Sequence, residues 1–89
     1  MSGGSHRTLR LAAQRIAALR GDLLSAVIAE PVPPGSRVDL LLPREERPVS
    51  GKVVAVRRTA EGEAEIDLRL YSLPRERRAR IEALVSPRS

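Results

Sequence analysis

The chain has 89 residues, a formal net charge of +5, no cysteine and a single histidine, His6. This length fits one small domain, the lack of cysteine excludes disulfides and thiolate metal sites, and one histidine is too few for a zinc site or histidine-based catalysis. No window holds the roughly 18 apolar residues of a membrane-spanning helix, and no signal peptide is evident, so we expect a cytoplasmic protein.

The N-terminal third allows two interpretations. Residues 1–6 are predicted to be a flexible leader. Between residues 7 and 30 the apolar side chains recur at spacings of three and four, and Ala and Leu favour helix, which predicts a helix over Arg7–Leu19 before a strand over Leu24–Glu30. The alternative is three strands, which would be Leu9–Ala13, Ile16–Leu19 and Leu24–Ala29.

Two sets of side chains in this segment are candidate binding residues. Guanidinium groups match phosphate and carboxylate oxygens in pairs, so the basic set is a candidate ligand site. Its members are Arg7, Arg10, Arg15 and Arg20. The apolar set would form one stripe of a helix and could contact a protein partner or a second copy of the chain, although it could equally cap the core of a monomer. Its members are Leu9, Ala13, Ile16 and Leu23.

The rest of the chain is predicted to form strands and a final helix. A turn rich in proline, residues 31–36, precedes apolar strands over Arg37–Leu42 and Val49–Arg58. Glu63–Tyr71 alternates apolar and polar residues, which predicts a half-buried strand with Ala64, Ile66, Leu68 and Leu70 inside. Pro74 suits the first turn of a helix over Arg75–Val85, and we expect this helix to pack on the preceding strand through Ile81 and Leu84.

The motifs of enzymes and cofactor sites are missing from the sequence. Its glycines do not form a phosphate-binding loop, and its serines have no histidine partner for a nucleophilic triad. The acidic run from Glu61 to Asp67 could attract a cation, but a solvated strand face explains it better. We therefore expect no enzymatic activity, no metal and no cofactor.

From Pro31 onward the chain resembles the PilZ domain over about 55 residues. Pro31–Gly35 is similar to the family's P-L-x-x-G turn, and the segment that begins at Gly51 is similar to its G-x-V-x-x-V strand. The strand that ends at Tyr71 and the basic helix Arg75–Val85 complete the resemblance. It implies a mainly β fold, a small antiparallel β-barrel with a C-terminal helix, formed by residues 7–86 as a single domain with 87–89 as a tail. An N-terminal helix would be added if the first interpretation holds.

PilZ domains commonly bind cyclic di-GMP through R-x-x-x-R and D/N-x-S-x-x-G motifs, and this sequence departs from both. By position, Ala18 would stand for the acid, Arg20 for the serine and Leu23 for the glycine, and the N-terminal arginines lack the R-x-x-x-R spacing. The resemblance therefore implies weak or absent cyclic di-GMP binding, and a bacterial regulatory module that acts through protein–protein interaction in cyclic di-GMP-related, motility or surface signalling.

Two other functions stay open on the sequence. A rearranged set such as Arg7, Arg10 and Arg20 could still hold cyclic di-GMP. A small basic barrel could bind nucleic acid, which we do not expect because Tyr71 is the only aromatic residue and single-strand binders stack bases on aromatic side chains.

Overall fold

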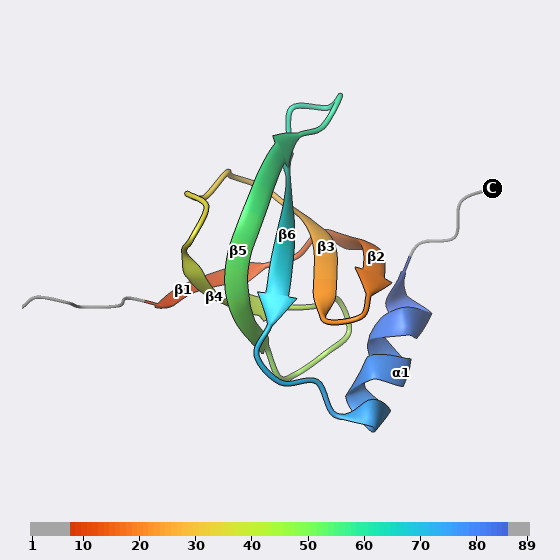
Figure 1. The fold of residues 1–89 in the computed structure, drawn as a ribbon. Coiled ribbons are helices and arrows are strands. Elements are labelled where there is room, and N and C mark those ends of the chain that lie inside the picture. The colour runs from red at the N-terminus through yellow and green to blue at the C-terminus, as the bar shows by residue number, and fades with distance from the viewer. Residues whose placement is uncertain (1–7, 86–89) are drawn as a thin grey trace, which may run out of the picture.

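The computed structural model of the chain describes residues 8–85, which form six strands and one helix (Figure 1). The elements are β1 Thr8–Ala12, β2 Arg15–Arg20, β3 Leu23–Ile28, β4 Arg37–Leu41, β5 Val49–Arg58, β6 Ala64–Leu70 and α1 Arg75–Leu84. The predicted mainly β class with a C-terminal helix is confirmed. The predicted leader, residues 1–6, and tail, residues 87–89, lie outside the described residues.

The strands form one curved, mixed sheet in the order β1-β4-β5-β6-β3-β2. The edge strands β1 and β2 follow each other in the sequence: the Ala13 amide donates to Leu41 at 2.8 Å, and the Gln14 amide donates to Val27 at 2.7 Å. Within two residues the chain thus passes from one edge of the sheet to the other. β1 is parallel to β4, so the expected all-antiparallel sheet is wrong, and within residues 8–85 β1 and β2 are not paired along their lengths, so the barrel is not closed.

The predicted helix over Arg7–Leu19 is wrong, and the alternative with strands is confirmed over the described residues. In β1, Leu9 and Leu11 pack against the core on alternate positions, and in β2 Ile16 is fully buried. Ala and Leu favour helix only weakly, by tenths of a kcal/mol per residue, so burial against the sheet decides the outcome. Gly21, with φ 56°, allows the tight turn from β2 to β3.

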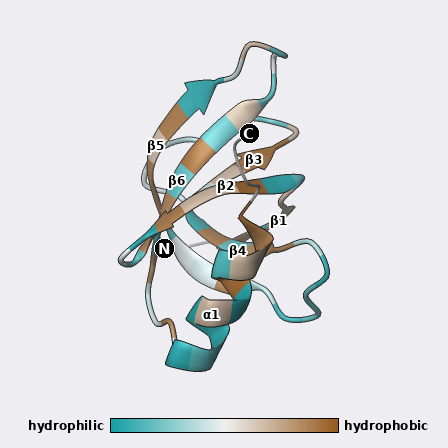
Figure 2. Ribbon diagram, turned by 90° about the vertical axis from the view of Figure 1, so that its right-hand side faces the viewer, coloured by the Kyte–Doolittle hydropathy of each residue, from teal (hydrophilic) through white to brown (hydrophobic). Residues whose placement is uncertain are grey.

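The core lies on the concave side of this sheet. In β6 the residues Ala64, Ile66, Leu68 and Leu70 are buried, as the alternating sequence predicts. Figure 2 shows the same alternation as bands of brown and teal along β6. The buried side chains form a single cluster to which β2, β3, β4, β5, β6 and α1 all contribute.

The helix α1 closes one side of the core. Ile81 is its fully buried residue, and Val85, next to the helix end, forms a parallel bridge with Ile16 of β2. The sequence predicts that α1 packs on β6. The backbone of α1 instead lies next to β2, and Ile81 joins the core cluster that contains Ile66, Leu68 and Leu70 of β6. The interpretation with a helix over Arg7–Leu19 contains no strand at residues 15–20. This strand, β2, is the one that α1 covers.

Candidate functional site

The predicted arginine set does not form one cluster in the part of the chain that the structure describes. Arg7 lies outside the described residues. Arg10 is on the edge strand β1, opposite Asp39 of β4. Arg15 and Arg20 stand at opposite ends of β2, where Arg15 forms an ion pair with Glu63 at 3.4 Å. A shared ligand site would need these arginines close together on one surface. The strand topology instead places them apart.

The predicted apolar contact stripe belongs largely to the core. Ile16 has no exposed surface, and Leu9 and Ala13 pack against the core cluster. Ile16 points from β2 into the core, so in this structure it is not available for contact with a partner. Leu23 is half-buried and lies on the outer face of β3, so it alone of the four takes part in the surface described next.

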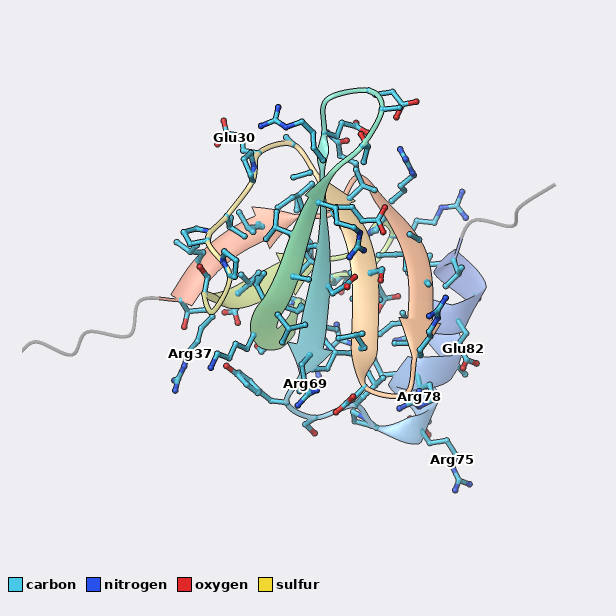
Figure 3. All side chains as sticks on the ribbon, turned by 45° about the horizontal axis from the view of Figure 1, so that its top comes forward. Glu30, Arg37, Arg69, Arg75, Arg78 and Glu82 are labelled. Carbon is cyan, nitrogen blue, oxygen red and sulfur yellow. The ribbon has the colours of Figure 1, made fainter. Side chains whose placement is uncertain are left out.

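A row of basic side chains crosses the outer face of the sheet, and we call it the cationic row. Arg37 of β4 is opposite Lys52 of β5, and Lys52 is opposite Arg69 of β6. The row continues through Leu23 of β3 to Arg20 of β2. Residues directly opposite each other share one face of a sheet, so these four cations point outward together. Figure 3 shows Arg37 and Arg69 projecting from the sheet into solvent.

The cationic row does not help the sheet to fold. Like charges directly opposite each other on neighbouring strands are destabilising, and Arg37, Lys52 and Arg69 form two such pairs. Over residues 8–85, the ion pairs involve Arg15 and Arg57, so the four cations of the row have no carboxylate within 4.0 Å. Arg20 acts on Asp67 only at longer range. An arrangement that costs stability and forms no ion pair with the carboxylates of residues 8–85 is typical of a functional surface.

Two exposed apolar side chains flank the centre of the cationic row. Val54 follows Lys52 by two residues on β5, and its exposed fraction is 45%. Tyr71 follows Arg69 by two residues just beyond β6, where its amide donates to Ser50, and its exposed fraction is 56%. The face thus combines cations with a tyrosine and a valine, and tyrosine and arginine are enriched at protein interfaces.

Next to the row, a network of hydrogen bonds fixes the outer face. The Arg57 guanidinium donates to both carboxylate oxygens of Asp67, at 2.8 and 2.9 Å, and to Glu65 at 2.8 Å. The Ser25 hydroxyl donates to Asp67 at 2.7 Å. These bonds join β5, β6 and β3 and pair Arg57 with two carboxylates of the acidic run, Glu65 and Asp67. A cation site there is not supported, because the described residues contain no cluster of three metal-ligating side chains.

A β-bulge directs Arg57 into this network. Val53 is opposite Leu68 and Ala55 is opposite Asp67, so Val54 is an extra residue in β5. Without it, the alternation from Val53 would place Arg57 on the core face; with it, Arg57 stands opposite Glu65 on the outer face. The bulge therefore produces the outward position of Arg57, while Val54 is exposed on the same face as Lys52.

The network shifts the protonation of Asp67. Its hydrogen bond with Arg57 holds the pKa of the Asp67 carboxyl below its usual range, the Ser25 hydroxyl acts in the same direction, and partial burial opposes both. The hydrogen bonds to Asp67 and then Glu65 raise the pKa of Arg57. Because the folded pKa of Asp67 is depressed, its stabilisation is present above the unfolded value of about 3.9 and is lost as the pH falls through the folded value.

We expect Asp67→Asn to lower the free energy of unfolding by about 1–2 kcal/mol near neutral pH, because the charge-assisted bonds to a half-exposed Arg57 are lost. The difference from the wild type should shrink when urea unfolding is repeated at pH values below about 4. Glu61→Gln, an exposed loop carboxylate, serves as the control and should behave as the wild type. An equal difference at both pH values would show that the charge of Asp67 contributes nothing.

A second candidate region is an open cleft of about 830 Å³ between α1 and the loop from β4 to β5. It is lined by Arg44, Glu45, Glu46, Arg47, Pro74, Glu76, Arg77 and Arg80. Arg77 donates to the carbonyl of Arg47, which ties the helix to the loop. Four arginines and three glutamates line this cleft, so it offers no uniform potential to a charged ligand, and we favour the cationic row.

The sequence signals Arg20 and the outward position of Arg69 but not the cationic row as a whole. Arg37 and Lys52 are ordinary polar positions of their strands until the register places them opposite each other. Strand order and register come from the tertiary fold, so spacing along the chain carries no signal for them.

In the described part of the chain, no helix is long and apolar enough to span a membrane. Comparison with protein-family models, with curated proteins and with solved structures found no match to this chain in any of the three.

Proposed function

We propose that this chain is a non-enzymatic, PilZ-like regulatory module of the bacterial cytoplasm that binds an acidic segment of another protein through the cationic row. The processes that the resemblance suggests are cyclic di-GMP-related, motility or surface signalling. The observation that carries the proposal is the row of four exposed cations, with two like-charged pairs directly opposite each other and no carboxylate partner among residues 8–85.

The shape of the surface supports a protein partner over a small ligand. Sites for small molecules are concave and enclose most of the ligand. The cationic row instead crosses the outward face of five neighbouring strands. At about 4.8 Å per strand it follows the sheet for roughly 19 Å, which suits an extended surface better than one dinucleotide.

The side chains around the row support an acidic protein over nucleic acid. Proteins that bind single-stranded nucleic acid add aromatic platforms for successive bases, and Tyr71 is the one aromatic residue of the chain. Val54 offers an apolar contact that a phosphate backbone does not use, whereas apolar contacts at the centre of a charged rim are typical of protein interfaces. Complementary charge would then speed association and set the specificity.

The variant Lys52→Glu is expected to stabilise the fold and, at the same time, to weaken binding of an acidic partner. The new carboxylate would lie between Arg37 and Arg69, so two repulsive pairs become attractive ones and the free energy of unfolding should rise by about 0.2–1 kcal/mol. Affinity for a Glu-rich peptide, titrated at low salt by fluorescence anisotropy, should fall about tenfold because one attraction is replaced by a repulsion.

Arg75→Glu provides the matched control, because it changes the net charge equally on the exposed surface of α1. This variant should bind the peptide about as well as the wild type once the small effect of net charge is screened with salt. Equal losses in both variants would mean that only net charge matters, which contradicts the proposal. Tight binding of cyclic di-GMP or of a single-stranded oligonucleotide, lost in Lys52→Glu, would replace the protein partner by that ligand.

A further inference from the structure

Lys52 is the only lysine among sixteen basic residues, and it lies between Arg37 and Arg69 in the cationic row. We propose that Lys52 is a site of acylation by small acyl phosphates, and that acylation weakens binding of the acidic partner. This inference rests on the proposed function, because the regulated property is binding at the same row.

The surroundings of Lys52 fit an anionic acyl donor. Arg37 and Arg69 stand directly opposite it on the two neighbouring strands, and Cβ atoms of such pairs are about 4.5–5.5 Å apart. Guanidinium groups bind phosphate oxygens bidentately, so either arginine can hold the phosphate of the donor beside the amine. The side chain of Lys52 is exposed and forms no ion pair with the carboxylates of residues 8–85.

The reaction needs no oxidant or reductant. The neutral Nζ of Lys52 attacks the carbonyl carbon of the acyl phosphate, an N–C bond forms, and the C–O bond to phosphate breaks. The phosphate leaves with the electron pair of that bond and takes up the proton that the nitrogen loses, so it departs as hydrogen phosphate. The proton that made the Lys52 ammonium cationic has passed to water before the attack. The product is an uncharged amide, so one cation of the row is removed.

The loss of this charge should act on the row as a whole. Arg37 and Arg69 keep their charges, but the position between them becomes neutral and somewhat bulkier. A carboxylate of the partner that meets the middle of the row then loses its nearest cation, and charge removal of this kind is how lysine acetylation changes interactions.

Acetyl phosphate is the probe for the test, and the fraction of acetylated Lys52 is followed by mass spectrometry of proteolytic peptides. The α-amino group of the same chain is the internal reference for intrinsic reactivity. In the double variant Arg37→Gln and Arg69→Gln, acetylation of Lys52 relative to the α-amino group should slow several-fold, because the phosphate is no longer held. The matched variant Arg75→Gln and Arg80→Gln, which removes equal charge from α1, should react as the wild type does.

The binding readout separates the two proposals. Chain acetylated at Lys52 should bind the Glu-rich peptide several-fold more weakly than unmodified chain, and Lys52→Gln should match it. If the arginine variant and the α1 variant acetylate at the same rate, the acylation site is refuted while the acidic partner stands. If selective acetylation leaves peptide binding unchanged, both the regulation and the proposed function of the row are refuted.

Discussion

Leu68→Ala is expected to lower the free energy of unfolding by about 3–5 kcal/mol. Leu68 has no exposed surface and sits in the middle of β6, opposite Val53 of β5 on one side and Leu24 of β3 on the other. Truncation would leave a cavity in the core beneath β6, and the hydrogen bonds of β6 to β5 and β3 prevent the sheet from collapsing into it. A chain of this size is stabilised by roughly 4–13 kcal/mol, so much of its stability is at stake.

Thermal unfolding followed by circular dichroism checks this prediction. A loss of this size should lower the melting temperature by more than about 10 °C in so small a domain. Val54→Ala, an aliphatic truncation at an exposed position of β5, should change the unfolding free energy by less than about 0.5 kcal/mol. Equal effects at the two positions would contradict the core that the structure shows.

Gly51→Ala is expected to lower the free energy of unfolding by about 1–3 kcal/mol, although it adds a single methyl group. Gly51 is buried in β5 opposite Leu70, and a Cβ there would lie 2.4 Å from the carbonyl oxygen of Arg69 and 2.8 Å from Cγ of Leu68. The nearer atom belongs to the backbone of β6, so the strands themselves would have to move.

Chemical unfolding of Gly51→Ala and of the double variant with Leu68→Ala tests this explanation. Because the shortest contact is to backbone, removal of the Leu68 side chain should not rescue the variant, and the double variant should be less stable than Leu68→Ala alone. Ser50→Ala, which loses only an exposed hydrogen bond to Asp39, should cost less than about 1 kcal/mol. Full rescue in the double variant would show that the side chain alone causes the clash.

The second half of the fold could be predicted closely from sequence. The bounds of β5 match the predicted strand, and those of β4, β6 and α1 differ by one residue at one or both ends. Alternation with period two fixes the buried face of β6, and proline and glycine turns separate the strands. These signals are local, so they can be recognised in the sequence without knowledge of the tertiary fold.

The predicted helix in the first half of the fold is wrong because the local preference of these residues for helix disagrees with the strand pairing of the tertiary fold. Leu9, Ala13 and Ile16 follow both a helical spacing and, with Leu11, a strand alternation around a bend at Ala13 and Gln14. Ala-rich composition favours helix by small amounts, whereas pairing of β1 with β4 and of β2 with β3 buries Ile16 completely. Such pairing partners are far away in the sequence, and a window of residues does not contain them.

The candidate site was hidden for the same reason. The cationic row depends on the register of five strands, and the outward position of Arg57 depends on one extra residue at Val54. A bulge of this kind reverses the face of every following residue in the strand. The sequence does identify Arg20 and the outer face of β6, which are the parts of the surface that a single strand defines.

Amide NMR mapping of the Glu-rich peptide tests the cationic row most directly, because it reports every position of the surface in one titration. We predict that the largest shift changes fall on Arg37, Lys52 and Arg69, extend to Val54 and Tyr71, and diminish as salt is raised. The arginines of α1, which carry similar charge on another face, should respond weakly. Largest changes on Arg75–Arg80, with the row unaffected, would contradict the assignment of the binding face to the sheet.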